Sequence, residues 1–120
     1  MKQKIVIVDD DKLVLDLYSD FFKQHDFKVH VATSVDVALK IIRQETPDII
    51  LSDIVMPVKY GFVLYEEVKL FDPDIPFIFM TGFEHDKKIV SKLKKVDCKW
   101  ISKPVKLEEL LNLVLSQLKN

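Results

Sequence analysis

This sequence predicts an α/β fold in which the strands of a parallel sheet alternate with helices. Short runs rich in β-branched residues alternate five times with longer segments whose apolar residues recur at helical spacing. Runs such as IVIV and FIFM are apolar at every position, as in a parallel sheet that is buried on both faces. Because the connections are short, we expect right-handed crossovers that place helices on both faces of a doubly wound sheet.

The first half of the chain accounts for three strands and two helices. The strands are expected at Lys4–Val8, Phe27–Ala32 and Ile49–Ser52. Asp11 is the expected N-cap of the first helix, and Thr33 or Ser34 is expected to cap the second helix, SVDVALKIIRQ. The apolar spacing predicts inward faces formed by Val14, Leu17, Tyr18 and Phe21 in the first helix and by Val37, Ala38, Ile41 and Ile42 in the second.

The second half repeats the alternation of strands and helices. After a loop through Gly61, the segment FVLYEEVKLF has the spacing of a helix. Strands are expected at Pro76–Met80 and Lys99–Ser102, with a helix from about Glu84 to Lys95 between them. The last helix carries one apolar stripe, formed by Leu107, Leu110, Leu111, Val114 and Leu118. Leu113 lies off this stripe and is a candidate contact for a partner.

Composition indicates one globular domain over residues 1–120. A chain of this length can bury a core, and 48% hydrophobic with 31% charged residues is ordinary for a folded soluble protein. No linker, repeat or low-complexity tract marks a domain boundary. Eighteen basic and nineteen acidic residues give a net charge of -1, which favours neither nucleic acid nor an anionic membrane as the partner.

Cysteine usage and hydropathy make the cytoplasm the expected compartment. Cys98 is the only cysteine, so no intramolecular disulfide is expected, and a small buried side chain is its expected role. The chain enters a strand-like run almost at once instead of a signal peptide, and no apolar run approaches the roughly 20 residues that cross a bilayer. His25, His30 and His85 lack the spacing of metal ligands.

Polar residues stand just past the ends of four predicted strands, at the edge where open parallel sheets bind their ligands. They are Asp9, Asp10 and Asp11, then Asp53, then Thr81 and Gly82, and finally Lys103 and Pro104. Carboxylates that lie close together repel unless a cation neutralises them, and a hard ion with few protein ligands and several waters suits Mg²⁺. A lysine beside such an ion indicates that an anionic group, which we take to be phosphoryl, is delivered there. With only two glycines, the chain has no glycine-rich loop for a dinucleotide or nucleoside triphosphate.

These segments carry a resemblance to a known family. VDD after the first strand, DIVMPVKYG after the third, TG after the fourth and KP after the fifth resemble the response-regulator receiver domain of two-component signalling. The resemblance covers the whole chain in order and spacing, and it implies a flavodoxin-like sheet with strand order 2-1-3-4-5. The sequence departs from the family pattern at KKVDCKW, before the fifth strand, and at Trp100, where the family usually has Tyr or Phe.

The resemblance also implies a role for each residue of the site. Asp53 would be the phosphoacceptor, and Asp9 and Asp10 would hold Mg²⁺ together with Asp53 and the backbone carbonyl of Val55. Lys103 would contact the transferred phosphoryl group. Thr81 would turn its hydroxyl toward that group, and Trp100 would act as the switch aromatic. Alignment and charge neutralisation are what phosphoryl transfer requires, and these residues supply both.

The implied function is a signalling switch. A histidine kinase or phosphotransfer protein would phosphorylate Asp53, and the face formed by the fourth helix, fifth strand and fifth helix would then change its contacts. Self-dephosphorylation is expected to be slow, because neither Val55 nor Phe83 can orient an attacking water. Beyond it and self-phosphorylation, no enzymatic activity is expected. A homodimer is compatible with the family. The kinase, the downstream partner, and whether the domain stands alone or belongs to a longer regulator or hybrid kinase stay open.

Two other functions remain as alternatives. A degenerate receiver would bind partners without phosphorylation, but the complete set of Asp9, Asp10, Asp53, Thr81 and Lys103 argues against it. A small Mg²⁺-dependent phosphatase is disfavoured because Val55 stands where a second acid would be expected, two residues after Asp53.

Overall fold

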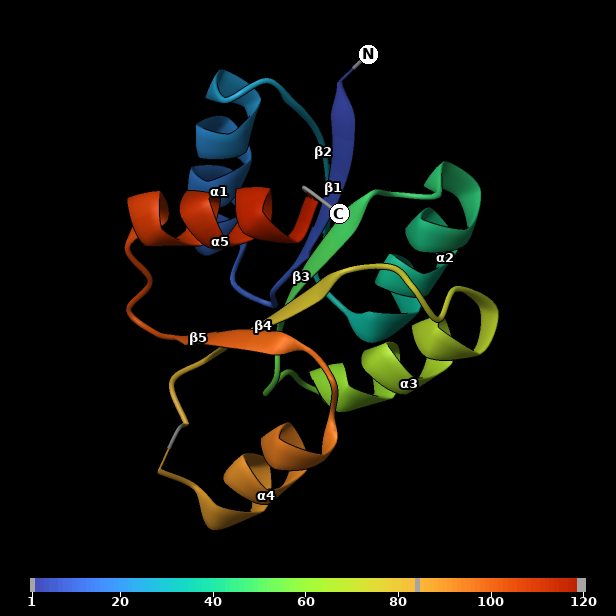
Figure 1. Cartoon of the computed structure of the whole chain (residues 1–120), viewed down its shortest axis with the longest axis vertical. Coiled ribbons are helices and arrows are strands. Elements are labelled where there is room, and N and C mark those ends of the chain that lie inside the picture. Colours follow the sequence, from blue (N-terminus) through green and yellow to red (C-terminus); the bar gives the residue numbers. More distant parts are fainter. Residues whose placement is uncertain (1, 84, 119–120) are drawn as a thin grey trace.

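The computed structural model describes residues 2–83 and 85–118 and contains a five-stranded parallel sheet. The strands are β1 Gln3–Val8, β2 Phe27–Ala32, β3 Ile49–Asp53, β4 Phe77–Thr81 and β5 Lys99–Ser102. The helices are α1 Lys12–Gln24, α2 Val35–Glu45, α3 Gly61–Phe71, α4 Lys87–Lys95 and α5 Leu107–Leu118. The strand order is β2-β1-β3-β4-β5 and every pairing is parallel, which confirms the predicted fold class and order (Figure 1).

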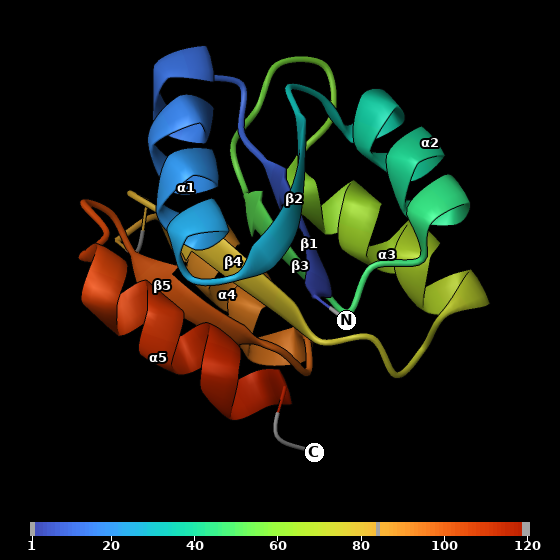
Figure 2. The same cartoon turned by 90° about the horizontal axis from the view of Figure 1, so that it is seen from above.

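Two hydrophobic clusters fill the space between the sheet and the helices. Helices α2, α3 and α4 pack over one face of the sheet, and α1 and α5 pack over the other (Figure 2). The central strands β1, β3 and β4 supply fully buried side chains to both clusters, which explains why their sequences are apolar at nearly every position. No helix in the described part of the chain has the length and apolar character needed to cross a membrane.

The predicted inward faces of α1 and α2 were partly wrong. In α1 the buried residues are Leu15, Tyr18 and Phe22, whereas Leu17 is 55% exposed. In α2 the buried residues are Val35, Ala38 and Ile42, whereas Val37 is 44% exposed. Apolar residues three and four apart occur on two overlapping faces of each helix, and only the direction in which the helix crosses the sheet decides which face is buried.

In α5 the predicted stripe is confirmed, with Leu110, Leu111 and Val114 buried and Leu107 and Leu118 packed partly against the core. Leu113, which the spacing placed off the stripe, also packs partly against this core cluster. The inward face of α5 is therefore wider than the stripe alone suggested.

The starts of α1 and α2 agree with the expected caps. Asp11 caps α1 by accepting hydrogen bonds from the amides of Leu13 and Val14, and Ser34 rather than Thr33 caps α2. Helix α4 begins at Lys87 behind an Asp86 cap, later than expected, and the predicted start at Glu84 lies outside the described residues.

Candidate functional site

The carboxyl ends of β1, β3, β4 and β5 bring together the residues that the sequence singled out. Asp53 is the last residue of β3, Asp9 follows β1 directly, Thr81 ends β4 and Lys103 follows β5. The register aligns Val8 with Ser52 and Thr81 with Ser102, so the strands end side by side. Asp9, Asp53 and Thr81 are buried, with exposed fractions of 1%, 8% and 0%. The predicted convergence on one edge of the sheet is therefore present.

Lys103 joins the two buried carboxylates. Its Nζ donates a hydrogen bond to Asp9 Oδ2 and another to Asp53 Oδ2, each at 2.9 Å. The second oxygen of each carboxylate accepts from a backbone amide: Asp9 Oδ1 from Asp11 at 3.0 Å and Asp53 Oδ1 from Ile54 at 2.8 Å. Both carboxylates are thus held at both oxygens, and charged partners make such bonds stronger than neutral ones.

The pKa values of Asp53 and Lys103 are both raised, but for different reasons. Burial raises the pKa of Asp53, and the hydrogen bond and charge of Lys103 only partly offset that effect, while the nearby Asp9 adds to it. Burial alone would lower the pKa of Lys103, but its bonds to Asp53 and Asp9 outweigh burial and raise that pKa. One ammonium therefore lies between two buried carboxylates, an excess of acidic groups that a further cation could neutralise.

The donor set fits a small hard cation such as Mg²⁺. One carboxylate oxygen from each of Asp9, Asp10 and Asp53 lies within 4.8 Å of the others. Two ligands on opposite sides of a Mg²⁺ ion lie about 4.2 Å apart, so small side-chain rotations would bring these oxygens into range. Asp10 is exposed, whereas the carboxylates of Asp9 and Asp53 each accept hydrogen bonds at both oxygens.

The remaining predicted residues surround this cluster. The hydroxyl of Thr81 accepts a hydrogen bond from the amide of Phe83 at 2.9 Å, and the carbonyl of Thr81 accepts from the amide of Lys103 at 2.7 Å. Trp100, which lies within β5, is 43% exposed, and Phe83, which lies past the end of β4, is 49% exposed. Val55 packs half-buried against the core cluster on the α2–α4 face.

Two residues beside Asp53 were not recognised from the sequence. The hydroxyl of Ser52 donates to the carbonyl oxygen of Asp53 at 2.8 Å, and Gly61, the first residue of α3, lies directly over the same oxygen. A Cβ on Gly61 would collide with that carbonyl and would lie 3.1 Å from Ser52 Oγ. The scarcity of glycine could have drawn attention to Gly61, since a chain with only two glycines places one of them here.

Gly61→Ala is expected to destabilise the fold by about 1–3 kcal/mol, because the added methyl group must displace strand backbone instead of a flexible side chain. Urea denaturation of both proteins measures the difference. Gly82→Ala is the matched control, since the nearest atom to a Cβ there is Lys103 Cβ at 3.9 Å, an ordinary contact. Equal stability losses in the two variants would show that α3 does not rest tightly on Asp53.

The comparison with known families adds to this geometry. The family model described as the response regulator receiver domain matches residues 5–115. The chain belongs to this family. The receiver domain is 30% identical over 112 residues to the two-component response regulator ARR14 of Arabidopsis thaliana, a match that covers 92% of this chain and 29% of that protein. The regulator ARR10 of the same plant is also 30% identical, with 20% of its length covered. The chain thus spans less than a third of these curated relatives.

Solved receiver structures share the whole fold. The CheY-like receiver domain protein of Methanospirillum hungatei superposes with a TM-score of 0.90 at 28% identity, covering 98% of this chain and 94% of that one. Chemotaxis protein CheY4 of Vibrio cholerae superposes with a TM-score of 0.88 at 25% identity, covering 97% and 98%. The chain is therefore the receiver domain of a two-component response regulator, as its sequence motifs predicted.

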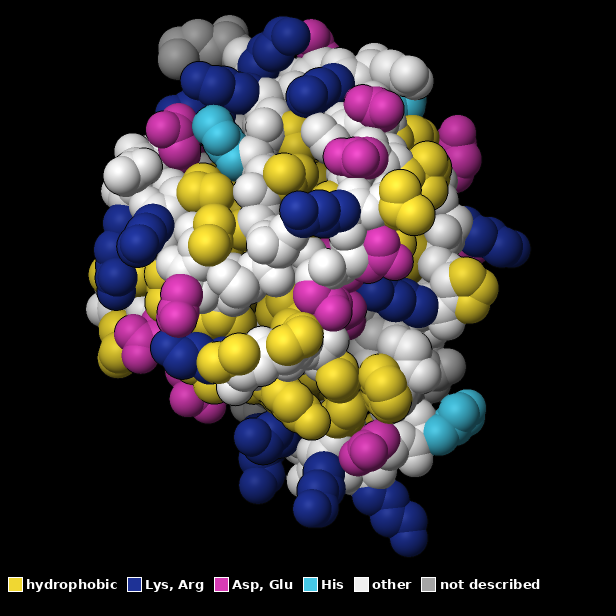
Figure 3. Space-filling view, turned by 180° about the vertical axis from the view of Figure 1, so that it is seen from behind, with side chains coloured by type: hydrophobic (Ala, Val, Ile, Leu, Met, Phe, Trp, Pro, Cys, Tyr) yellow, Lys and Arg dark blue, Asp and Glu magenta, His cyan; other side chains and the backbone are white. Residues whose placement is uncertain are grey.

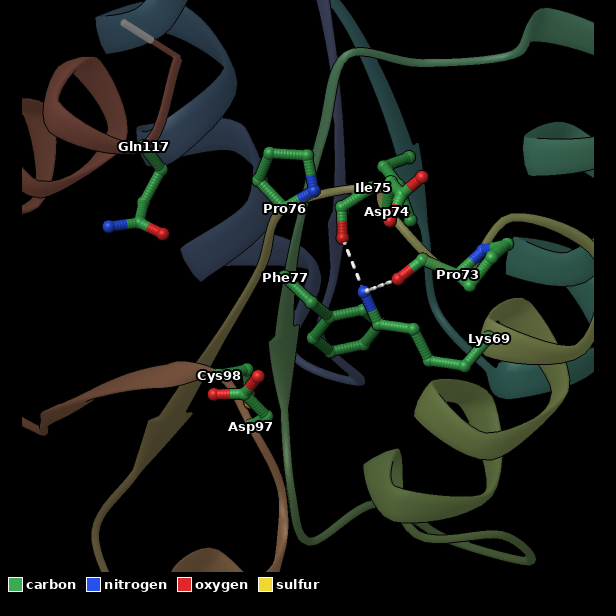
Figure 4. A pocket seen from close by; sticks show the side chains of 9 residues that line it. All are labelled: Lys69, Pro73, Asp74, Ile75, Pro76, Phe77, Asp97, Cys98 and Gln117. Carbon is green, nitrogen blue, oxygen red and sulfur yellow. Dashed lines mark hydrogen bonds between the residues drawn. The ribbon is translucent and has the colours of Figure 1, made fainter. Parts of the chain in front are cut away.

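One cavity of the described receiver domain lies away from the carboxylates. It measures about 430 Å³ and is lined in part by Lys69, Asp97, Cys98 and Gln117, near the starts of β4 and β5 (Figure 4). Lys69 Nζ donates hydrogen bonds to the carbonyls of Pro73 and Ile75, so its ammonium is held by the loop between α3 and β4. Burial raises the pKa of Cys98 to about 12, which leaves an inert thiol. This cavity contains none of the predicted site residues.

Proposed function

We propose that this receiver domain accepts a phosphoryl group on Asp53 from a histidine kinase or phosphotransfer protein. A carboxylate oxygen of Asp53 would attack phosphorus, the bond from phosphorus to the donor histidine nitrogen would break, and that nitrogen would keep the electron pair. The observation that carries the proposal is the pair of 2.9 Å bonds by which Lys103 holds both Asp9 and Asp53 at the ends of their strands. The same ammonium can follow the phosphoryl oxygens as negative charge accumulates there.

Magnesium is the cofactor that this proposal requires. Asp9, Asp10, Asp53 and the backbone carbonyl of Val55 would hold it, and it would supply charge neutralisation at the transferred group. Asp9 Oδ2 and Asp53 Oδ2 now accept hydrogen bonds from Lys103, so the ion would share these two carboxylates with the lysine. We expect Lys103 to release one carboxylate when the ion binds, which frees its ammonium for the incoming phosphoryl group.

The response would spread through Thr81 and Trp100. The hydroxyl of Thr81 would leave the amide of Phe83, its present donor, and bond a phosphoryl oxygen instead. Trp100 aligns with Phe79 in the sheet and is 43% exposed, so it has room to bury further. A phosphoryl group would thus bias two arrangements of the face formed by α4, β5 and α5.

The positive charge of α4 indicates what kind of protein surface this face would bind. Its sequence KKIVSKLKK contains five exposed lysines and no acid, and lysine side chains extend from the end of the molecule where α4 lies (Figure 3). Lys87 and Lys88 stand in the first helical turn, where the helix dipole disfavours positive charge. Such an arrangement suits an acidic protein surface as the downstream partner, whose binding should weaken as salt increases.

The phosphoacceptor assignment is tested with acetyl phosphate and Mg²⁺. We expect the intact mass to increase by one phosphoryl group, carried by the peptide that contains Asp53, and to stay unchanged when a chelator removes the metal. No adduct under saturating conditions would favour the alternative of a phosphorylation-independent interaction module. Steady turnover of a phosphoester would instead favour a phosphatase.

Self-dephosphorylation is expected to be slow. Val55 lies two residues after Asp53 and packs half-buried, and Phe83 lies two residues after Thr81, so neither side chain can hydrogen-bond an attacking water. Measuring the decay of the phosphorylated mass after removal of acetyl phosphate tests this. Loss of the adduct within seconds would contradict it, and Val55→Asn is expected to shorten the lifetime.

Cytoplasmic location and assembly belong to the same proposal. A phosphohistidine donor is a cytoplasmic partner, and the half-buried Cys98 suits a reducing compartment. A homodimer through the α4–β5–α5 face would be detected as a rise in solution mass on phosphorylation. Equal masses before and after phosphorylation would argue for a monomeric switch.

A further inference from the structure

Ser52 is a buried polar residue to which neither the sequence nor the proposed switch assigns a role. Four polar or charged side chains are buried in the described part of the chain: Asp9, Ser52, Asp53 and Thr81. The other three belong to the candidate site. Ser52 has an exposed fraction of 0% and immediately precedes Asp53 in β3.

Packing alone does not require a hydroxyl at this position. In the sheet, Ser52 aligns with Val8 on one side and Phe79 on the other, both fully buried apolar residues. An alanine would suit such neighbours, and burying a hydroxyl costs free energy unless it is hydrogen-bonded. The hydrogen bond that the hydroxyl donates therefore explains why a serine occupies this position.

That bond fixes the peptide unit between Asp53 and Ile54. Ser52 Oγ donates to the carbonyl oxygen of this unit at 2.8 Å, and the amide of the same unit, which belongs to Ile54, donates to Asp53 Oδ1 at 2.8 Å. A peptide unit is planar, so fixing its carbonyl also fixes the direction of its amide. The hydroxyl of Ser52 thus orients the donor that holds the reactive carboxylate.

Helix α3 restrains the same peptide unit. Gly61 lies over the carbonyl oxygen of Asp53, close enough that any side chain there would collide with it. The amide of Gly61 donates to the carbonyl of Ile54 at 2.7 Å, which fixes the next peptide unit as well. Ser52 and the start of α3 together leave the Asp53–Ile54 peptide little freedom to rotate.

We propose that Ser52 is a positioning residue for phosphoryl transfer, acting through the Asp53–Ile54 peptide unit to hold Asp53 Oδ1 in its reactive orientation. This proposal rests on Asp53 being the phosphoacceptor. Among the described hydrogen bonds, Ser52 makes none to Asp9, Asp10 or Lys103, so its effect should reach the site only through the orientation of Asp53.

The test compares Ser52→Ala, Ser52→Thr and the wild type. We expect Ser52→Ala to lower the maximal rate of phosphorylation by acetyl phosphate about tenfold, because a poorly oriented carboxylate reaches the reactive geometry less often. The concentration of acetyl phosphate at half-maximal rate, measured at saturating Mg²⁺, should change less than about twofold. Ser52→Thr keeps a hydroxyl and should restore most of the rate.

A second measurement does not depend on phosphorylation. Hydrogen exchange of the Ile54 amide, followed by NMR without acetyl phosphate, should accelerate in Ser52→Ala and stay slow in Ser52→Thr. If Ser52→Ala does not fold, Ser52→Cys replaces it, because a thiol nearly keeps the volume but is a weak donor. A Ser52→Ala protein with wild-type rate and wild-type Ile54 exchange would overturn the proposal. A wild-type protein that is never phosphorylated would overturn the proposed function, while the exchange comparison would still decide the role of Ser52.

Discussion

Asp53→Asn is expected to abolish the phosphoryl adduct and, at the same time, to make the metal-free protein more stable at neutral pH. The amide cannot attack phosphorus as a carboxylate does, so acetyl phosphate should leave the mass unchanged. The gain in stability follows from burial, which raises the pKa of Asp53 above 3.8 and so makes its ionised form costly in the folded state. Asparagine has nearly the same shape and carries no charge.

The pH dependence of this gain has a defined sign. A raised pKa in the folded state means that the protonated carboxyl stabilises the fold below pH 3.8 and that this contribution is lost as pH rises through the folded pKa. The stability difference between Asp53→Asn and wild type should therefore be largest at neutral pH and shrink toward pH 3.8. Urea denaturation at several pH values in the presence of a chelator measures it.

Asp20→Asn is the control for this variant, because Asp20 is exposed on α1 and should show no such trend. Added Mg²⁺ should stabilise the wild type and reverse the order of the two proteins, since ion binding requires the ionised carboxylate. An Asp53→Asn protein that is less stable than wild type in chelator would show that Lys103 more than compensates for the burial of Asp53.

Lys103→Met is expected to cost about 3 kcal/mol of stability without metal, because it leaves two buried carboxylates with no cation. Methionine keeps the unbranched chain up to the ε position and lacks only the ammonium, so the loss mainly reports charge and hydrogen bonding. The same change should slow phosphorylation about 100-fold, the usual effect of removing one donor to a developing negative charge. Chemical denaturation and acetyl phosphate kinetics give the two values.

Mg²⁺ and pH distinguish the loss of charge in Lys103→Met from a packing defect. Mg²⁺ neutralises the same carboxylates, so it should restore part of the stability of Lys103→Met but little of its phosphorylation rate. Because the pKa of Lys103 is raised in the folded state, the stabilisation that it provides is complete below pH 10.5 and is lost only as pH rises through the folded pKa. Lys99→Met, an exposed change on β5, should alter stability by less than about 0.5 kcal/mol. A deficit in Lys103→Met that neither Mg²⁺ nor alkaline pH reduces would point to packing.

The sequence predicted the sheet and the convergence of its site because both depend on strong local signals. Asp53 and Lys103 follow apolar runs directly, and a charged residue at the carboxyl end of a buried parallel strand is typical of a ligand site. The inward faces of α1 and α2 were harder to predict. The exposed residues Leu17 and Val37 fit helical spacing just as closely as the residues that are buried. The choice is made by the angle at which each helix crosses the sheet.

The contacts of Ser52 and Gly61 had no local signal of this kind. A serine within an apolar strand is only a weak interruption of the pattern, and its role appears only when α3 is placed over the Asp53 carbonyl. Trp100 shows the same limit, since its position in the sequence indicated a switch aromatic but not that the indole would be 43% exposed.

The span of the Lys103 contacts has a consequence for the order in which this protein matures. Lys103 reaches back 94 residues to Asp9 and 50 residues to Asp53, and its strand β5 lies at the edge of the sheet. A growing chain on the ribosome can form β1, β3 and β4 before Lys103 has emerged, so the acidic half of the site exists first without its cation. We expect that a chain from which Lys103 has not yet emerged cannot receive the signal, so that competence to be phosphorylated begins only when β5 and Lys103 have joined the sheet.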